Sequence, residues 1–273
     1  MSMAQADTVA FIGGGNMAGS LIGGLLAGGF DPTAIRVAEP NAEHRAALAN
    51  ARPGIRVTAD NVEAASGADC VVLAVKPQVM AEVAAGLNAL PDGSVFLSIA
   101  AGVTCTRLAT WLGTDRAIVR SMPNTPALIG CGATGAYANP AVEPGQRALA
   151  DRILHAVGEV VWFDDERALD AVTALSGSGP AYVFLLIEAL EAGGIELGLE
   201  PDVARRLALL TAHGASRLAL KSDDSPGVLR TKVTSPGGTT EQALGVFEKG
   251  GLRELVAQAM QAAAQRSREL SGE

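Results

Sequence analysis

The chain of 273 residues has few aromatic side chains and few charges. Phe, Trp and Tyr make up 4% of it and charged residues 18%, whereas hydrophobic residues make up 48% and Gly occurs 32 times. The high apolar content excludes a disordered chain, and the length excludes a small stapled scaffold in favour of one large or two medium domains. With so few aromatics, Ala, Leu and Val must fill the core, which suits helix-on-helix and helix-on-sheet packing.

Cysteine is also scarce. Cys70, Cys105 and Cys131 are far apart and odd in number, so they cannot supply a disulfide framework. None has a Cys or His neighbour at zinc-ligand spacing. We expect buried thiols, a reducing cytoplasmic location and no metal.

A basic stripe is missing, and so is a convincing membrane segment. With 21 basic and 29 acidic residues the net charge is -8, so we expect no nucleic-acid partner. Residues 8–30 carry no charge and are long enough to cross a bilayer. Frequent glycines, and the absence of Lys or Arg before Arg36, argue against a signal peptide or a membrane span. We expect no membrane partner.

Common catalytic motifs are absent as well. The chain has no Gly-Lys pair of a P-loop and no G-x-S-x-G elbow, and His44, His155 and His213 occur in no motif. Phosphoryl transfer and serine hydrolysis therefore lose most of their support.

What the first 163 residues do contain is an alternation of strand-like apolar runs and helical periods. This predicts the α/β class, with an N-terminal Rossmann-like doubly wound parallel sheet over residues 1–163. Two further edge strands are expected near its end. The strand-like runs are 8–12, 35–38, 55–58, 70–75, 94–99, 116–121, 133–138 and 159–163.

Residues 164–273 show helical periodicity throughout, so we expect an all-helical second domain. Their apolar faces are too broad for such a small bundle to bury alone, which predicts a dimer across a two-fold axis. The expected helices cover 165–199, 201–221, 226–233, 240–249 and 252–270.

The turn after the first strand fits the pattern G-x-G-x-x-A. Gly13 would allow the tight turn, Gly15 would let a pyrophosphate approach the backbone, and Ala18 would bring helix and strand together. A dinucleotide site is favoured over a merely glycine-rich turn. Asn16 and Met17 open the helix that would face the phosphates.

Glu39 ends the second strand, where a carboxylate can bind both ribose hydroxyls of NAD. Asn41, His44 and Arg45 follow, so NADP could be accommodated if Glu39 turns away. A solvated surface carboxylate is the competing interpretation, and the cofactor stays open as NADP or NAD.

Two further loops are expected at the carboxyl edge of the sheet. Lys76 and Pro77 follow the fourth strand, where Lys76 could face cofactor phosphate or ribose, or could be an ordinary solvated lysine. Asn124, in the loop Met122–Pro126, could position a nicotinamide or substrate, or could serve only as a turn former.

Two small-residue motifs fall in the helical half. The run Ser176–Tyr182, SGSGPAY, should interrupt or bend its helix, because Gly and Pro disfavour a helix interior; a close helix crossing is the alternative. The run Ser235–Gln242 contains Thr239 and Gln242 at capping-box spacing, so the N–H groups from Gly237 to Thr240 could receive a carboxylate. An ordinary capped helix start is the alternative there.

Together the motifs FIGGGNMA, AVKP, MPNTP, ALSGSGPAY and SPGGTT, in this order, resemble the pyrroline-5-carboxylate reductase family over nearly the whole chain. The resemblance implies reduction of 1-pyrroline-5-carboxylate to L-proline by NAD(P)H, the last step of proline biosynthesis. It also implies a Rossmann domain, a helical dimerisation domain, an active site shared between subunits, and commonly a decamer of five dimers.

Residue roles follow from the same resemblance. Gly13, Gly15, Asn16 and Met17 would hold the pyrophosphate, Ala74, Lys76 and Pro77 would lie beside the ribose, and Asn124 would lie near the nicotinamide. The loop with Ser235, Gly237, Gly238 and Thr239 would receive the substrate carboxylate. Thr240 would hydrogen-bond the ring nitrogen, with Ser176 beside the substrate.

Two rival functions are weaker. The first is a β-hydroxyacid dehydrogenase, and a resemblance to that family would imply a catalytic lysine on the helix between the two domains. No lysine occurs between Lys76 and Lys221. Alcohol oxidation without a general base is hard to support, whereas imine reduction needs none. A dinucleotide-binding sensor without turnover would be expected to have a degraded substrate loop, yet Ser176, Gly238 and Thr240 are present.

Overall fold

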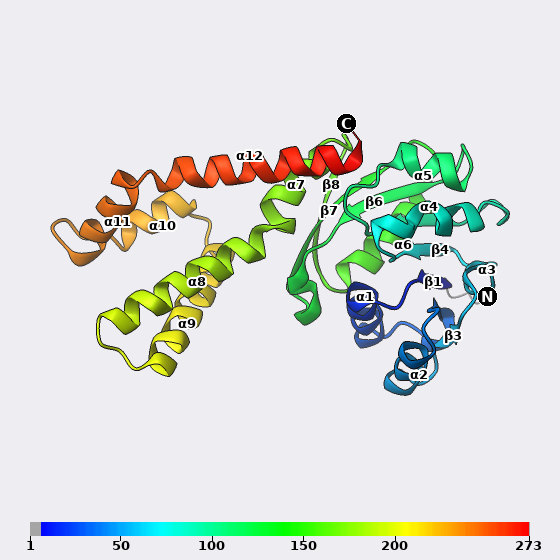
Figure 1. Ribbon diagram of the computed structural model, residues 1–273, viewed down its shortest axis with the longest axis horizontal. Helices are drawn as coiled ribbons and strands as arrows, with labels where there is room; N and C mark the ends of the chain where they lie inside the picture. Colours follow the sequence, from blue (N-terminus) through cyan, green and yellow to red (C-terminus); the bar gives the residue numbers. More distant parts are fainter. Residues whose placement is uncertain (1–6, 273) are drawn as a thin grey trace. The chain divides into compact units, whose positions relative to one another are not determined.

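The computed structural model describes residues 7–272 and divides into two compact units (Figure 1). The first unit runs up to Gly177 and takes in the chain again from Ala263, while the second comprises Ser178–Ala262. The boundary expected at residue 163 coincides with the end of the last strand, whereas the contacts of the first unit continue to Gly177. As a limit between functional domains, residue 163 stays a prediction.

The first unit is built on one eight-stranded sheet in the order β3-β2-β1-β4-β5-β6-β7-β8. The first six strands run parallel, β7 is antiparallel to β6, and β8 is parallel to β7. The expected doubly wound sheet with two added edge strands is therefore confirmed. The strands are β1 (Val9–Ile12), β2 (Ile35–Ala38), β3 (Arg56–Thr58), β4 (Cys70–Leu73), β5 (Val95–Ser98), β6 (Ile118–Met122), β7 (Gly132–Ala138) and β8 (Gly158–Phe163).

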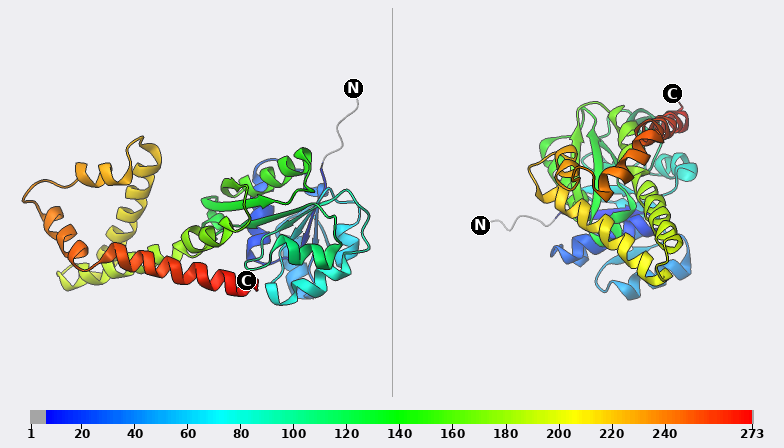
Figure 2. Two further views of the ribbon diagram at one scale, coloured as in Figure 1. Left: turned by 90° about the horizontal axis from the view of Figure 1, so that it is seen from above. Right: turned by 90° about the vertical axis from the view of Figure 1, so that its left-hand side faces the viewer.

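Helices cover both faces of this sheet (Figure 2). Successive side chains of β1 point to opposite faces, so Val9 and Phe11 join one hydrophobic core while Ala10 and Ile12 join the other. Burial on both faces explains the continuous apolar character of β1 and β4. The first core packs against α1 (Asn16–Ala27), α2 (Ala42–Ala51) and α6 (Pro144–His155), and the second against α3 (Asn61–Ala65), α4 (Pro77–Gly86) and α5 (Cys105–Leu112).

The long helical run after β8 is interrupted, as its sequence predicted. After α7 (Ala168–Val172) the chain forms a π-helical turn, Thr173–Gly177, before α8 (Gly179–Glu196) begins with Pro180 in its first turn. A side chain on Gly177 would lie 2.6 Å from Cε of Met122. The small residue thus lets the turn pack closely on the end of β6.

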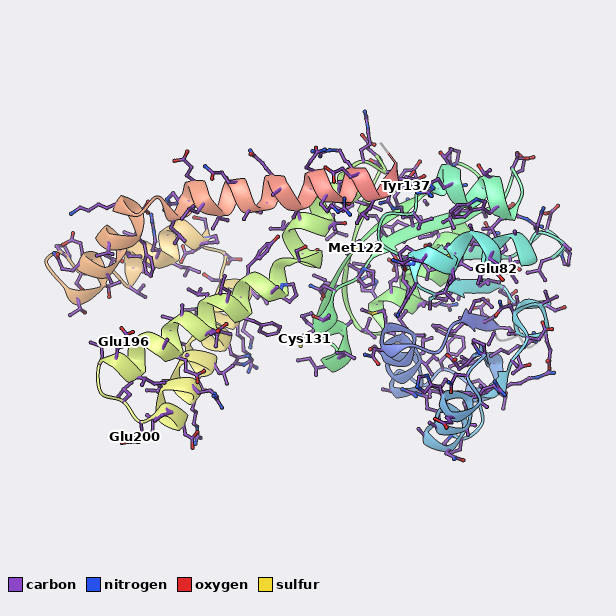
Figure 3. All side chains as sticks on the ribbon, viewed as in Figure 1. Glu82, Met122, Cys131, Tyr137, Glu196 and Glu200 are labelled. Atoms are coloured by element: carbon purple, nitrogen blue, oxygen red, sulfur yellow. The ribbon has the colours of Figure 1, made fainter. Side chains whose placement is uncertain are left out.

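The second unit is helical throughout its length. Helices α8 and α9 (Pro201–Lys221) form an antiparallel hairpin, and Figure 3 labels Glu196 and Glu200 at either end of the turn that joins them. Within the hairpin Arg205 pairs with Glu191 at 2.9 Å. Helices α10 (Pro226–Lys232), α11 (Thr239–Lys249) and α12 (Leu252–Ser271) follow, and the last turns of α12 belong to the first unit.

Candidate active site

The glycine turn after β1 is as tight as its sequence predicted. Gly13 adopts a φ of +100°, and a Cβ there would lie 2.7 Å from the carbonyl oxygen of Ala74. Its N–H donates to the carbonyl of Ala38 at 2.9 Å, which ties the turn to the end of β2. Any side chain would both clash and be strained, so this position requires glycine.

The next residues form an open cradle of backbone donors. Gly15 is exposed and a Cβ there would meet no atom within 4 Å. Within residues 7–272, the N–H groups of Gly15, Asn16 and Met17 have no hydrogen-bond partner, and α1 begins here without a side-chain cap. Three unpaired donors at the positive end of a helix suit a phosphate, so the residues present fit a dinucleotide. A cavity of about 370 Å³ adjoins this turn and includes Gly14, Gly15 and Asn16 in its lining.

Glu39 lies at the end of β2, but its carboxylate points into the fold. One oxygen accepts the N–H of Gly14 at 3.1 Å and the other accepts the N–H of Asn41 at 2.9 Å. Only 8% of the residue is exposed. The alternative of a solvated surface carboxylate is therefore wrong.

Ala74, Lys76 and Pro77 follow β4 at the same carboxyl edge. The N–H of Ala74 donates to the carbonyl of Ile12 at 2.9 Å, which brings this loop beside the glycine turn. Pro77 opens α4, and Lys76 precedes it as an exposed residue that caps no backbone group. Among the ion pairs of the described residues none involves Lys76, so its ammonium group can approach an anion bound at this edge.

Asn124 connects two loops through its side chain. Its amide nitrogen donates to the carbonyl of Ser176 at 3.0 Å, and its amide oxygen accepts the N–H of Ala133 at 2.9 Å. The residue is 8% exposed. Asn124 thus fixes the π-helical turn to the end of the sheet. The Oγ of Ser176 donates to the carbonyl of Val172 at 3.1 Å, so its lone pairs remain able to accept.

A buried ion pair ties the end of the sheet to the segment before α7, and the sequence analysis did not predict it. Arg120 on β6 pairs with Glu166 at 3.0 Å, and the same Glu166 oxygen accepts the N–H of Cys105 at 2.8 Å. The side chain of Arg120 is 6% exposed and that of Glu166 20%. An arginine inside an otherwise apolar strand, RAIVRS, was the available signal. Burial raises the pKa of the Cys105 thiol, and the negative charge of Glu166 adds to the rise.

The expected carboxylate-binding loop lies in the second unit, and the structure corrects its details. Helix α11 begins at Thr239 with Gly238 as its N-cap and no side-chain cap, so the expected Thr239–Gln242 capping box is wrong. Glu241 fills that role instead, because its carboxylate accepts the N–H of Gly237 at 2.7 Å. Gly237 has a φ of +69°, which favours glycine in this turn.

Some of the expected amide donors of this loop are therefore already used. The N–H of Gly238 donates to the carbonyl of Ser235 at 3.0 Å. The N–H groups of Thr239, Thr240 and Glu241 have no partner in the part of the chain that the structure describes. Ser235 and Thr239 are exposed and Thr240 is half-buried. The first turn of α11 thus has three donors available for an anion.

The expected site residues thus form two groups. The glycine turn, Glu39, the loop after β4, Asn124 and Ser176 all lie in the first unit, around the carboxyl edge of its sheet. The loop from Ser235 to Thr240 lies in the second unit. The dinucleotide residues and the carboxylate loop therefore belong to different compact units of the chain.

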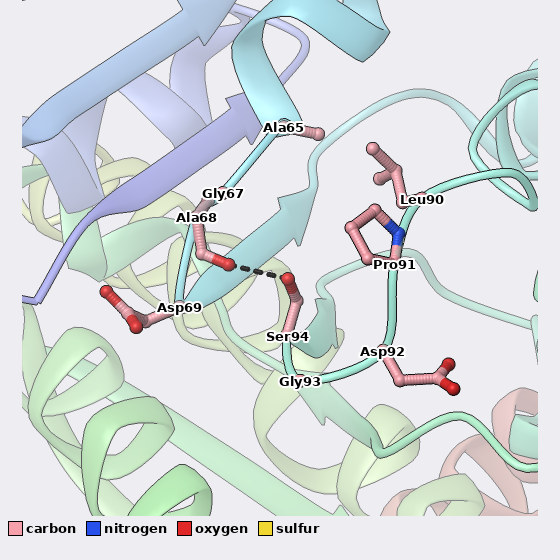
Figure 4. A pocket seen from close by; sticks show the side chains of 9 residues that line it. All are labelled: Ala65, Gly67, Ala68, Asp69, Leu90, Pro91, Asp92, Gly93 and Ser94. Atoms are coloured by element: carbon pink, nitrogen blue, oxygen red, sulfur yellow. Dashed lines mark hydrogen bonds between the residues drawn. The ribbon is translucent and has the colours of Figure 1, made fainter.

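A different hollow lies at the opposite, amino edge of the sheet and holds none of the expected residues. This cavity of about 220 Å³ precedes β4 and β5, where Ser94 donates to the carbonyl of Ala68 (Figure 4). Ligands in open α/β sheets bind at the carboxyl edge, so we assign this hollow no role.

One helical run has the length and composition of a membrane span. It covers Ala168–Glu196, and the most apolar stretch of 18 residues within it has a mean hydropathy of 1.3 and is 11% buried. A dimer interface would bury the same apolar surface.

Comparison with known proteins finds a family match for each half of the chain and relatives that match it over its full length. Residues 166–270 match the family described as pyrroline-5-carboxylate reductase dimerisation, and residues 8–102 match the NADP oxidoreductase, coenzyme F420-dependent family. The pyrroline-5-carboxylate reductase of Pseudomonas aeruginosa is 52% identical over 264 residues, covering 96% of each chain. That of Haemophilus influenzae is 42% identical, covering 97% of this chain and 98% of the relative.

Solved structures agree over the full length. A pyrroline-5-carboxylate reductase from Coxiella burnetii superimposes with a TM-score of 0.94 at 44% identity, covering 98% of this chain and 99% of that one. A Plasmodium falciparum pyrroline carboxylate reductase with NADP bound gives a TM-score of 0.87 at 28% identity, covering 98% and 100%. From its glycine turn to its dimerisation helices, the chain belongs to the pyrroline-5-carboxylate reductase family.

Proposed function

We propose that the protein reduces 1-pyrroline-5-carboxylate to L-proline with NAD(P)H, the last step of proline biosynthesis. The observation that carries the proposal is an open glycine cradle in a chain that is 52% identical, over 96% of its length, to the P. aeruginosa reductase. Nucleotide binding alone would not identify the substrate, whereas the full-length match includes the second unit as well.

The reaction requires little acid or base chemistry from the protein. A cyclic imine needs a hydride at carbon and a proton at nitrogen, and the protonated imine is already a good electrophile. The reduced nicotinamide supplies the hydride when it is bound. The chain can therefore contribute mainly by orienting the substrate and holding its carboxylate, which agrees with a site without a histidine motif.

The residues fall into two roles in this proposal. Gly13, Gly15, Asn16 and Met17 receive the pyrophosphate, while Glu39, Ala74, Lys76, Pro77 and Asn124 complete the dinucleotide side. The loop that contains Ser235, Gly237, Gly238 and Thr239 holds the substrate carboxylate, chiefly where it enters α11, because the N–H groups from Thr239 to Glu241 are free within the described residues. Thr240 hydrogen-bonds the ring nitrogen, and Ser176 lies beside the substrate.

We further propose that two subunits share each active site and that five dimers assemble into a decamer. The dimerisation family matched by residues 166–270 and the exposed apolar side chains of α8 support the dimer. We infer that Ala168–Glu196 lies in this interface and does not cross a membrane. The cysteines at 70, 105 and 131 are unpaired, which supports a cytoplasmic location, although Cys131 is exposed and not buried as its sequence predicted.

The direct test follows NADPH or NADH absorbance while the protein is incubated with pyrroline-5-carboxylate. Thr240→Ala should lower kcat/KM by at least about tenfold, or roughly 1.4 kcal/mol, because the ring nitrogen loses its partner. The matched control is Thr231→Ala, an exposed threonine of α10 whose hydroxyl donates only to the carbonyl of Gly227. If the protein shows no turnover with either cofactor, a non-catalytic sensor is the better interpretation. Unchanged kinetics in Thr240→Ala would refute the hydrogen bond proposed for Thr240.

A further inference from the structure

The start of α11 keeps its backbone donors free because its N-cap is a glycine. Helix α11 begins at Thr239, and Gly238 before it has no side chain that could accept an N–H group. A Ser, Thr or Asp at an N-cap normally accepts the N–H of the second or third helical residue, which here are Thr240 and Glu241. Within residues 7–272 both of these N–H groups lack a partner. The glycine thus leaves donors for an external anion, but it does not stabilise the turn.

Glu241 stabilises this turn from inside the helix. Its Oε2 accepts the N–H of Gly237 at 2.7 Å, so the third residue of α11 reaches back beyond the N-cap. Gly237 has a φ of +69°, and this left-handed bend leads the chain into the helix. The N–H of Gly238 donates to the carbonyl of Ser235 at 3.0 Å. The two N–H groups at the bend are therefore bound internally.

The internal contacts and the free donors use different N–H groups. A capping side chain at position 238 would compete with an incoming carboxylate, and its Cβ would lie 3.0 Å from the carbonyl oxygen of Ser235. Glu241 instead uses the donor of Gly237, which precedes the helix. A loop that is ordered before binding gives a tighter complex, because less conformational freedom is lost when the ligand arrives. The Glu241 contact orders the loop without occupying the donors at its end.

The charge of Glu241 does not explain a benefit to substrate binding. A carboxylate in the first turn of a helix stabilises the helix, but it repels a second carboxylate at the same end. Glu241 is exposed, so solvent and salt weaken this repulsion. What favours binding is the length of the side chain, which brings an acceptor oxygen to the N–H of Gly237.

We propose that Glu241 is a positioning residue for the substrate. It holds the bend at Gly237 so that the free N–H groups of Thr239 and Thr240 are ready for the substrate carboxylate, and it acts as a hydrogen-bond acceptor and not as a charge. Glu241 itself does not touch the substrate. This inference rests on the proposed function, because it takes the substrate carboxylate to bind this loop.

Two substitutions separate the reach of Glu241 from its charge. Glu241→Asp keeps the charge but is one methylene too short to reach Gly237, whereas Glu241→Gln keeps an acceptor oxygen at the same distance and removes the charge. We expect Glu241→Asp to raise KM for pyrroline-5-carboxylate about fivefold, the factor for a hydrogen bond of about 1 kcal/mol. Its kcat should stay within about twofold, since bound substrate orders the loop. Glu241→Gln should stay within about twofold in both constants.

The controls come from the same assay and from a second acidic residue. KM for NADPH should not change, because the glycine cradle belongs to the other compact unit. Inhibition by L-proline, which carries the same carboxylate, should weaken in Glu241→Asp by the same factor as substrate binding. Glu254 is an exposed acidic residue in the first turn of α12 that forms no hydrogen bond or ion pair among the described residues. Glu254→Asp and Glu254→Gln should therefore change nothing.

Three results would overturn the inference: an unchanged KM in Glu241→Asp, an equal rise in Glu241→Gln, or a parallel rise in KM for NADPH. A KM that falls severalfold in Glu241→Gln would also overturn it, because the charge would then oppose the substrate more than the contact helps. If Glu241→Asp does not fold, Glu241→Ala decides, since it removes the same acceptor. An unmodified protein that does not reduce pyrroline-5-carboxylate would refute the proposed function itself, whereas an active protein with any of these results would refute only the role of Glu241.

Discussion

The two units bury their apolar side chains to very different extents. The first has two cores, one on each face of the sheet, and strands such as β1 and β4 are buried along their whole length. In the second, Ala204 and Ala208 are the buried residues, and α8 has none. A unit that hides so little of its apolar surface cannot be stable alone. The second unit therefore depends on a partner chain for its core, whereas the first contains its own.

The largest expected effect comes from a charge on the exposed apolar surface of α8. Leu185 is 66% exposed in the single chain, so Leu185→Arg would bury an unpaired guanidinium when two copies associate. We expect dissociation and loss of most activity, since removing a charge from water without a partner costs several kcal/mol. Sedimentation measures the assembly and NADPH oxidation measures the activity.

The matched control for this change is Val62→Arg. Val62 is an exposed apolar residue of α3 in the first unit, at 46% exposure, where arginine should remain in solvent. The Val62→Arg variant should assemble as the unmodified protein does. A dimer that survives Leu185→Arg would contradict the comparison between the two units.

In the first unit, breaking the Arg120–Glu166 pair should be the most costly substitution. Arg120→Met leaves Glu166 partly buried with one donor fewer, and removing one partner of a buried pair costs about 3–5 kcal/mol. Chemical denaturation at a fixed protein concentration measures the loss. Arg167→Met tests whether the effect comes from burial, because the side chain of Arg167 is 81% exposed and its loss should be small. Equal effects of the two substitutions would contradict the assigned role of the buried pair.

A smaller effect is expected where the C-terminal turn of α12 contacts α7. The Oγ of Ser267 donates to Oδ1 of Asp170 at 2.5 Å, and both residues are buried. Ser267→Ala leaves the carboxylate without this donor, which should cost about 1–3 kcal/mol. The free energy of unfolding should fall by that amount, while dimer formation should be unaffected. Ser216→Ala, in the middle of α9, is the control, and a Ser267→Ala variant as stable as the unmodified chain would refute the contribution.

The smallest effect is a pH dependence that arises in the first core. Burial raises the pKa of the Cys70 thiol above its ordinary value of 9.0, and the charge of Asp69 adds to the rise. Above pH 9 the unfolded chain therefore loses this proton while the folded chain keeps it. Stability from this thiol is complete below pH 9 and falls as the pH rises, by up to about 1.4 kcal/mol per unit. Cys70→Ala should flatten the decline between pH 9 and 10; an identical slope would refute it.

Much of the fold could be predicted because its signals are local. The periodicity change after β1 and the glycine pattern depend on neighbouring residues, and the helix Pro201–Lys221 was predicted with its observed bounds. The break at the SGSGPAY run was also expected, although its form as a π-helical turn was not. Strand ends differ by one or two residues, as at β4, where the sequence run continues past Leu73.

Parts of the site could not be predicted because they depend on distant contacts. No spacing rule joins Arg120 to Glu166, or Asn124 to Ser176, since these pairs form only when the sheet and α7 are in place. The capping box was wrong for a local reason: Thr239 and Gln242 have suitable spacing, but Glu241 reaches the N–H of Gly237 and the helix starts one residue earlier than that box requires. Several residues can compete for one helix end, and the pattern alone does not rank them.

The chain leaves the first unit after Gly177 and re-enters it at Ala263, so the second unit is an insertion whose two ends return to the same body. Leu169 is fully buried, and the last turn of α12 lies close to Gly102. A fragment ending at residue 163 would therefore lack α7, the π-helical turn and the C-terminal turn, and would expose part of its own interior. A nucleotide-binding fragment of this protein should retain both of these segments, joined by a short linker in place of residues 178–262.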